Sequence, residues 1–244
     1  MRLLLALAFI VAVSASAQPR MAPLVIPPEA GQLVLVVTPD WAATGGTLRR
    51  YERRGGAWQA AGEPAEVVVG RGGLGWGRGL HGTGAPGGLG GPAKREGDGR
   101  APAGAFALTE AFGYAEAAET GLPYVASDAD VECVDDAASR YYNRVLRRDS
   151  VAVDWTGHEE MRRRDDLYRL GVVVAHNAEA EPGAGSCIFL HVWRGPGSTT
   201  SGCTAMPSDA MDTVAAWLDA AERPVLVQLP EPAYLALKRA WGLP

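Results

Sequence analysis

The sequence has few cysteines, no large excess of either charge and no metal-binding pattern. Its 244 residues include three cysteines and four histidines, and their spacing matches no zinc site. The formal net charge is −5, and the arginine clusters at 147–148 and 162–164 alternate with aspartates. A nucleic-acid-binding surface needs clustered positive charge, so we predict no nucleic-acid partner. A phosphate-binding G-K-[S/T] loop is also missing, and we expect neither a metal nor another cofactor.

Long apolar runs are confined to the first residues of the chain. Arg2 precedes the apolar residues 3–13, and the small residues Ala15-Ser16-Ala17 follow. This order is typical of a cleaved secretory signal peptide, and the run is too short for a membrane anchor. We therefore expect residues 1–17 to be removed and the mature chain to have no stable membrane anchor. The predicted location is periplasmic, cell-wall-associated or extracellular.

Most of the elements that the sequence predicts are strands. Gly55-Gly56 predicts a hairpin, and residues 208–218 predict a helix with one apolar face. Runs of β-branched and apolar residues predict strands at 32–37, 65–70, 103–114, 171–175, 186–193 and 225–229. Because these strands do not alternate regularly with helices, we predict a mainly β domain with a few helices.

The segments between the strands are less regular. Residues 71–100 contain 13 glycines and predict a long irregular surface loop. Residues 136–148 fit either a short helix or an extended loop. A flexible leader over 18–31 is expected before a catalytic domain at 32–230. Residues 231–244 are expected to form a C-terminal helix and tail packed on that domain.

The odd number of cysteines is informative in an exported protein. Thiols pair in an oxidising compartment, so one of the three cysteines must remain single or pair between chains. Cys133 and Cys187 are a candidate disulfide, but the sequence gives no distance between them and the pairing stays open. Cys203 lies in the stretch GSTTSGCTAM, among glycines and hydroxyl residues. A structural cysteine usually has apolar neighbours, so Cys203 is the candidate working thiol.

A nucleophilic thiol needs a base, or a positive environment that lowers its pKa, and donors for the oxyanion. His191 is the candidate base because it lies on a predicted strand 12 residues before Cys203. The intervening Gly/Pro-rich loop can return Cys203 to the end of that strand. His176 ends another strand and is expected either to orient the site or to satisfy a turn. The N–H groups of Gly202 and Cys203 are the candidate oxyanion donors.

Other polar residues are candidates for support and substrate binding. Thr200 or Ser201 is expected to hold the imidazole tautomer, and Arg194 follows the His191 strand as a partner for a substrate carboxylate. Tyr142 and Asn143 belong to a segment that fits a cleft wall. The same segment also fits a surface helix with its own charge pairs.

Two stretches resemble YkuD-type L,D-transpeptidases. His191, a glycine-containing loop and then Thr200-Ser201-Gly202-Cys203 are similar to the family signature, and KREGDGRAPAGAFAL at 94–108 is similar to its G-x-x-T-P-x-G-x-F segment. The chain resembles a divergent branch. The family more often has His at the position of Ser201, and an aliphatic residue followed by Arg or Asn at the positions of Thr204 and Ala205.

The resemblance implies a sandwich- or barrel-like β-domain and a two-step acyl transfer. Cys203 would attack the L-centre carbonyl of diaminopimelate in a peptidoglycan stem peptide, releasing D-Ala. An amine would then resolve the thioester, with His191 moving the protons. The acceptor stays open between another stem, a lipoprotein, a D-amino acid and water. Water would make the enzyme an L,D-carboxypeptidase, and a monomer is expected.

Two other functions remain open from the sequence. One is a secreted wall-binding module without turnover, and the other is a secreted cysteine hydrolase with a different substrate. A Cys203 thiol of lowered pKa, reactive near neutral pH, is expected of the enzyme and not of the binding module.

Overall fold

The computed structural model describes residues 25–244. The predicted signal peptide at 1–17 lies outside these residues, as does the first half of the predicted leader, residues 18–24. The end of that leader is packed rather than free, because Ile26 and Ala30 are almost completely buried. No helix within residues 25–244 is long and apolar enough to cross a membrane.

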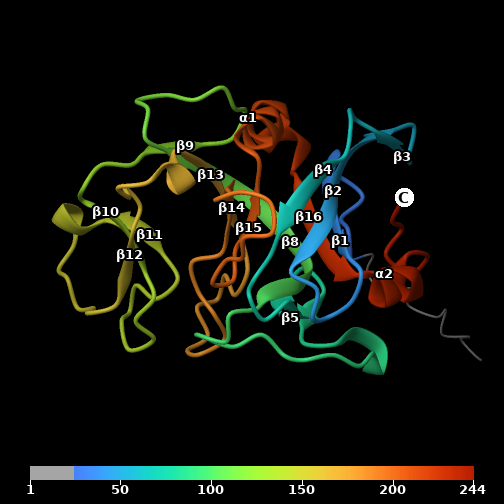
Figure 1. The fold of residues 1–244 in the computed structure, drawn as a ribbon, viewed down its shortest axis with the longest axis horizontal. Coiled ribbons are helices and arrows are strands. Elements are labelled where there is room, and N and C mark those ends of the chain that lie inside the picture. The colour runs from blue at the N-terminus through green and yellow to red at the C-terminus, as the bar shows by residue number, and fades with distance from the viewer. Residues whose placement is uncertain (1–24) are drawn as a thin grey trace, which may run out of the picture.

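Eight strands close into a barrel (Figure 1). The ring runs through β1 (Gln32–Thr38), β16 (Val225–Pro230), β8 (Ala101–Gly113), β13 (Leu170–Val174), β14 (Phe189–Val192), β15 (Thr204–Met206), β4 (Ala65–Val68) and β2 (Gly45–Arg54). Pairing of β2 with β1 completes it. Further strands attach to the ring or its loops: β3 (Ala57–Ala60), β5 (Leu74–Trp76), β6 (Arg78–Gly79), β7 (Gly82–Thr83) and β9 (Tyr124–Ala126). The predicted mainly β, barrel-like fold is therefore confirmed.

Both faces of the barrel strands are covered, which explains their continuous apolar runs. In β1, Val34 and Val36 belong to a core that also contains residues of α1 (Ser208–Trp217). Leu33 and Leu35 belong to a second core, which contains residues of α2 (Glu231–Leu237). Figure 1 shows the two helices on different sides of the barrel. The tail after α2 packs on the second core through Trp241 and Leu243.

A separate sheet of three strands stands beside the barrel, and we call it the side sheet (Figure 1). It consists of β10 (Val131–Val134), β11 (Val145–Arg147) and β12 (His158–Glu160). A disulfide joins Cys133 on β10 to Cys187, two residues before β14, with the Cα atoms 6.0 Å apart. Residues of the side sheet also share an apolar cluster with Phe112 and Phe189 of the barrel. Residues 136–148, left open between helix and loop, form turns and then β11.

The sequence predicted a surface loop for the glycine-rich segment at 71–100, and the structure shows that this prediction is incomplete. β5 within this segment is buried and pairs in parallel with β8. Gly73 shows why glycine is required here, since it has a φ of +73° and a Cβ at this position would lie 2.1 Å from the carbonyl oxygen of Trp41. Glycine lets this backbone run in close contact with its neighbours, so the segment forms part of the packed domain.

Candidate active site

The candidate nucleophile and base lie on neighbouring strands. His191 belongs to β14, and Cys203 stands immediately before β15, so the loop between them returns as predicted. The strands are parallel, with Leu190 opposite Thr204 and His191 opposite Ala205. Because side chains alternate along a strand, the thiol and the imidazole project to the same face. Both line one cavity of about 590 Å³.

Cys203 is a buried, neutral thiol in this structure. Its Sγ accepts a hydrogen bond from the Phe189 N–H at 3.4 Å and donates to the Cys187 carbonyl oxygen at 3.5 Å. Burial raises the pKa of the Cys203 thiol to about 12, and the nearby carboxylate of Glu159 adds to the effect. The prediction of a lowered thiol pKa is therefore wrong, because the side sheet and the barrel exclude water from this sulfur.

His191 is held in one tautomer by its own strand. Its Nδ1 lies 2.7 Å from the Val192 carbonyl oxygen. A carbonyl oxygen can only accept, so Nδ1 carries the proton and the lone pair is on Nε2. Burial lowers the pKa of His191 to about 4, so the imidazole is neutral at pH 7. A neutral imidazole with a free Nε2 lone pair can act as a general base.

The glycine and hydroxyl residues before Cys203 close a tight turn. Thr200 Oγ1 accepts from the Gly202 N–H at 3.1 Å and donates to the Cys203 carbonyl oxygen at 2.6 Å. The Gly202 N–H is therefore occupied and is not a free oxyanion donor. A Cβ on Gly202 would lie 3.1 Å from the Arg100 carbonyl oxygen, so glycine supplies space here. Thr200 and Ser201 do not hold the His191 tautomer, since the Val192 carbonyl does so.

Three of the predicted supporting residues lie outside the cavity lining. His176 Nδ1 accepts from the Arg78 N–H at 3.3 Å, its Nε2 lies 3.0 Å from the Ala184 carbonyl oxygen, and burial lowers the pKa of its imidazole to about 4. Tyr142 donates to Glu96 at 2.5 Å. Asn143 donates to the His176 carbonyl oxygen and accepts from the Cys187 N–H. Their hydrogen bonds run to Arg78, to Glu96 and to residues 176–187, away from the lining of the Cys203 cavity.

The cavity wall combines segments that are far apart in the sequence. Its lining consists of Arg71, Glu159, Arg163, Leu167, Tyr168, His191, Trp193, Arg194, Ser198, Thr199, Thr200, Ser201, Cys203 and Ala205. Arg194 is present as predicted. Arg71, Glu159, Arg163 and Tyr168 were missed, because nothing local in their segments indicates that the fold brings them to Cys203.

Tyr168 and Glu159 form a buried polar pair beside the thiol. Tyr168 ends the short 3-10 turn Asp166–Tyr168, and its hydroxyl donates to Glu159 of β12 at 2.5 Å. Burial raises the pKa of both groups. The Tyr168 ring meets the His191 ring edge-on, with centroids 5.2 Å apart. The side sheet therefore supplies one wall of the cavity through Glu159, and Tyr168 restricts the imidazole.

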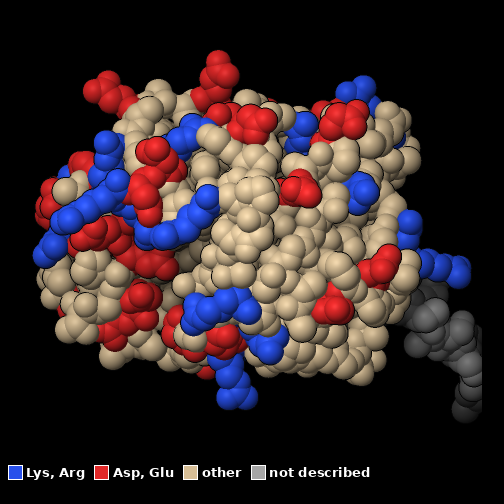
Figure 2. Space-filling view, in the orientation of Figure 1, with Lys and Arg blue, Asp and Glu red and all other residues tan. Residues whose placement is uncertain are grey.

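Arginines outnumber carboxylates in the cavity lining. It contains three arginines and one carboxylate, that of Glu159. Figure 2 shows acidic and basic side chains crowded together around the side sheet, while on the side that carries β1, β2 and β4 they are more scattered. Residues 25–244 contain no group of three or more His, Cys, Asp or Glu side chains that could hold a metal ion. The arrangement suits nucleophilic attack on an anionic substrate.

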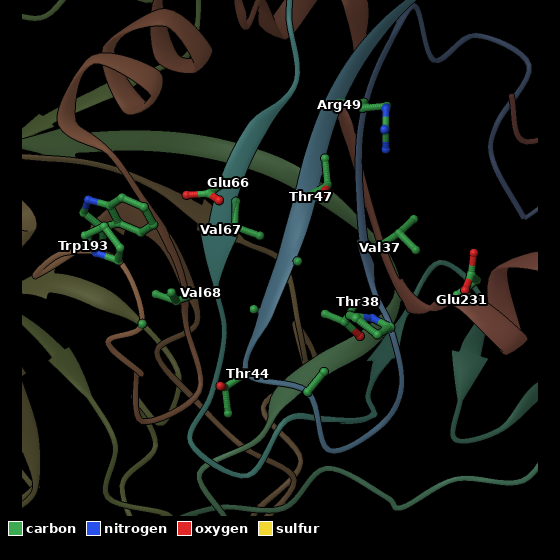
Figure 3. A pocket seen from close by; sticks show the side chains of 16 residues that line it. Val37, Thr38, Thr44, Thr47, Arg49, Glu66, Val67, Val68, Trp193 and Glu231 are labelled. Atoms are coloured by element: carbon green, nitrogen blue, oxygen red, sulfur yellow. The ribbon is translucent and has the colours of Figure 1, made fainter.

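A second hollow, of about 720 Å³, lies over β1, β2 and β4 (Figure 3). Thr38, Thr47, Arg49 and Glu66 line it, and Trp193 lines both this hollow and the Cys203 cavity. Neither cysteine nor histidine lines the second hollow. The chemistry therefore belongs to the Cys203 cavity.

Alkylation of Cys203 by iodoacetamide should rise about tenfold per pH unit from pH 7 to pH 10, without a plateau. The thiolate is the reactive form, and its fraction grows in this way below the pKa, which is about 12 here. Intact mass spectrometry gives the rate, because the other two cysteines are joined. In urea the rate should level off above about pH 9, since an ordinary cysteine has a pKa near 8.5. A plateau near pH 7 in the folded protein would instead indicate a resting thiolate.

Comparison with known proteins identifies the domain. The family model of the YkuD L,D-transpeptidase catalytic domain matches residues 45–227, three quarters of the chain. This range includes Cys203, His191 and every other residue of the cavity lining. Searches of curated proteins and of solved structures each gave no match. The chain therefore belongs to the YkuD L,D-transpeptidase catalytic domain family.

Proposed function

We propose that this protein is an exported cysteine acyltransferase that acts on peptidoglycan stem peptides as an L,D-transpeptidase. The observation that carries the proposal is the pair formed by Cys203 and His191. The only cysteine outside the disulfide, among the residues described, shares one cavity face with a histidine whose tautomer leaves Nε2 basic. That pair provides a nucleophile and a base within the matched family domain.

In the first half-reaction, the Cys203 sulfur attacks the carbonyl of the L-centre of diaminopimelate. The resting pair is neutral, because the pKa of Cys203 is raised and that of His191 is lowered. The thiol proton therefore passes to Nε2 as the C–S bond forms, rather than before substrate binds. The carbonyl oxygen becomes an oxyanion, which we assign to the Cys203 N–H because the Gly202 N–H is occupied.

The intermediate then collapses to a thioester. The imidazolium gives its proton to the leaving nitrogen, and D-Ala departs with an intact amino group. In the second half-reaction an acceptor amine attacks the thioester, loses a proton to His191 and frees the Cys203 thiol. A neighbouring stem as acceptor gives a 3→3 crosslink, and water gives an L,D-carboxypeptidase.

The cavity charge and the disulfide support this substrate and location. Stem peptides carry several carboxylates, which the arginine-rich lining suits. Disulfides such as Cys133–Cys187 form in oxidising compartments, which agrees with the signal peptide expected at residues 1–17. We therefore place the enzyme in the periplasm or at the cell wall, where peptidoglycan lies.

Incubation of the mature protein with a disaccharide tetrapeptide, followed by liquid chromatography and mass spectrometry, tests the proposal. We expect loss of D-Ala, a crosslinked dimer, and a transient enzyme adduct with the mass of the acyl group. Excess D-methionine should replace the released D-Ala when amines are accepted, and a tripeptide alone would indicate the carboxypeptidase. If neither D-Ala loss nor an adduct is observed, the proposed function is wrong.

One observation favours a second function, a wall-binding module without turnover. The buried Cys203 thiol has a raised pKa and makes its two hydrogen bonds to the backbone. Such a module would bind wall fragments and leave their stem peptides unchanged in the same incubation.

A further inference from the structure

Two of the three arginines in the cavity lining are already engaged by one carboxylate. Arg163 binds Asp165 through two hydrogen bonds, at 2.8 and 3.0 Å. Arg194 lies 3.6 Å from the same carboxylate. Arg71 takes part in no ion pair within residues 25–244, and its Nη1 donates only to the Ser201 hydroxyl at 3.3 Å. Arg71 therefore has guanidinium donors available for an incoming anion.

The backbone places Arg71 beside the nucleophile. The Arg71 N–H donates to the Thr200 carbonyl oxygen at 2.9 Å, and Gly70 forms a bridge with Thr200. Thr200 in turn binds the Cys203 carbonyl oxygen through its hydroxyl. Arg71 is thus attached to the turn that presents the thiol, although the two residues are far apart in the sequence.

The side chain of Arg71 also has a defined path. It crosses Gly99, where an added Cβ would lie 2.9 Å from Arg71 Cγ and 3.0 Å from Cζ. Gly99 has a φ of +69°, so the missing side chain and the backbone conformation occur together. The glycine-rich segment therefore leaves room for this guanidinium at the cavity.

The residues next to the nucleophile include no other positively charged side chain that could bind a substrate carboxylate. Ala205 lines the same cavity, but its methyl group cannot bind an anion. Ser201 is uncharged and already accepts from Arg71. A substrate carboxylate that enters next to Cys203 therefore meets Arg71 as the positive group without a carboxylate partner.

We propose that Arg71 is a substrate-binding residue that pairs with the free terminal carboxylate of the departing residue. This inference rests on the proposed function. The terminal residue directly follows the attacked carbonyl, and successive Cα atoms are about 3.8 Å apart, so its carboxylate lies close to the nucleophile. A planar guanidinium binds a carboxylate through two parallel hydrogen bonds, which sets the position of the scissile carbonyl over Cys203. Arg71 thereby selects stems that end one residue after the attacked centre.

The test compares two substrates and three variants by kcat/KM for release of the terminal residue. The substrates are a tetrapeptide with a free terminal carboxylate and the same peptide amidated at that carboxylate. Wild-type protein should prefer the free acid by about 10- to 100-fold, the value of a charge-assisted hydrogen bond. Arg71→Gln should lose this preference, because kcat/KM should fall for the free acid and stay unchanged for the amide. Arg71→Lys should keep part of the preference. Arg95→Gln, an exposed arginine of the same segment outside the cavity, should behave as wild type.

A binding measurement decides the role of Arg71 even without turnover. In the Cys203→Ala background, calorimetry should show tighter binding of the free acid than of the amide, and Arg71→Gln should remove the difference. If Arg71→Gln keeps the preference, or weakens both peptides equally, the assignment is wrong. It is also wrong if Arg71→Gln still weakens binding of the peptide amidated at its terminus but no longer weakens binding of a peptide amidated at the diaminopimelate carboxylate. Wild-type protein that binds but releases nothing would instead overturn the proposed function.

Discussion

Replacing Cys203 with alanine should abolish both the acyl-enzyme adduct and the release of D-Ala. The sulfur is the atom that bonds to the substrate, and no other thiol within residues 25–244 is free. His191 alone has no nucleophile to deprotonate in this variant. Intact mass spectrometry measures the adduct, and chromatography of the muropeptides measures turnover.

The alanine variant needs a folding control because Cys203 is buried. Removing Sγ leaves the Phe189 N–H without its acceptor, which costs about 1–3 kcal/mol of unfolding free energy. Cys203→Ser keeps an acceptor at nearly the same place and should recover most of that stability without recovering fast turnover. D-Ala release by a folded Cys203→Ala protein would contradict the assignment of the nucleophile.

Removing the disulfide by the double change Cys133→Ser and Cys187→Ser should lower the free energy of unfolding by about 2–5 kcal/mol. The bridge joins residues that are 54 positions apart. In the chain-entropy model, closing a loop of this length contributes about 4 kcal/mol by restricting the unfolded state. Denaturant unfolding, followed by the fluorescence of the tryptophans, gives the value.

The same double change should also reduce turnover. The side sheet carries Glu159, and it is tied to the barrel by the disulfide and by an apolar cluster. Without the bridge this wall of the cavity loses a covalent support, so water reaches Cys203 more easily and its thiol pKa should fall. The alkylation rate at pH 8 should therefore rise. A loss of stability below about 1 kcal/mol, with unchanged alkylation, would show that packing alone holds the side sheet.

The barrel strands could be predicted because their signal is local. Residues 32–37 and 225–229 are runs made mainly of Val and Leu, and the structure places both in strands that are buried on two faces. The alternation along β14 was also readable, with Leu190 and Val192 in the core and His191 on the cavity face. The pattern of apolar and polar side chains on the two faces of a strand can be read from a few consecutive residues.

The side sheet and β5 could not be predicted in the same way. β10, β11 and β12 have three or four residues each, with glutamate or arginine in every one. Strands this short gain their stability from the disulfide and from contacts with the barrel, which no local pattern contains. The glycines around β5 indicate a loop by composition, although close packing is what requires them.

The sequence by itself indicated the candidate nucleophile and the candidate base. It singled out Cys203 as the cysteine that lies among glycines and hydroxyl residues, without the apolar neighbours of a structural cysteine. It also singled out His191 as the histidine from whose strand a Gly/Pro-rich loop could return to Cys203. Those residues lie 12 positions apart, so local reasoning could relate them.

Only the tertiary structure decided the protonation states and the walls of the cavity. The pKa of a thiol or an imidazole depends on how completely other segments exclude water, and here the side sheet and Tyr168 do so. Arg71 reaches Ser201 across 130 positions of the sequence, and Glu159 of the side sheet lines the same cavity as Cys203, which follows it by 44 positions. Contacts of this range follow from the path of the whole chain, because burial and charge pairing depend on distances in space.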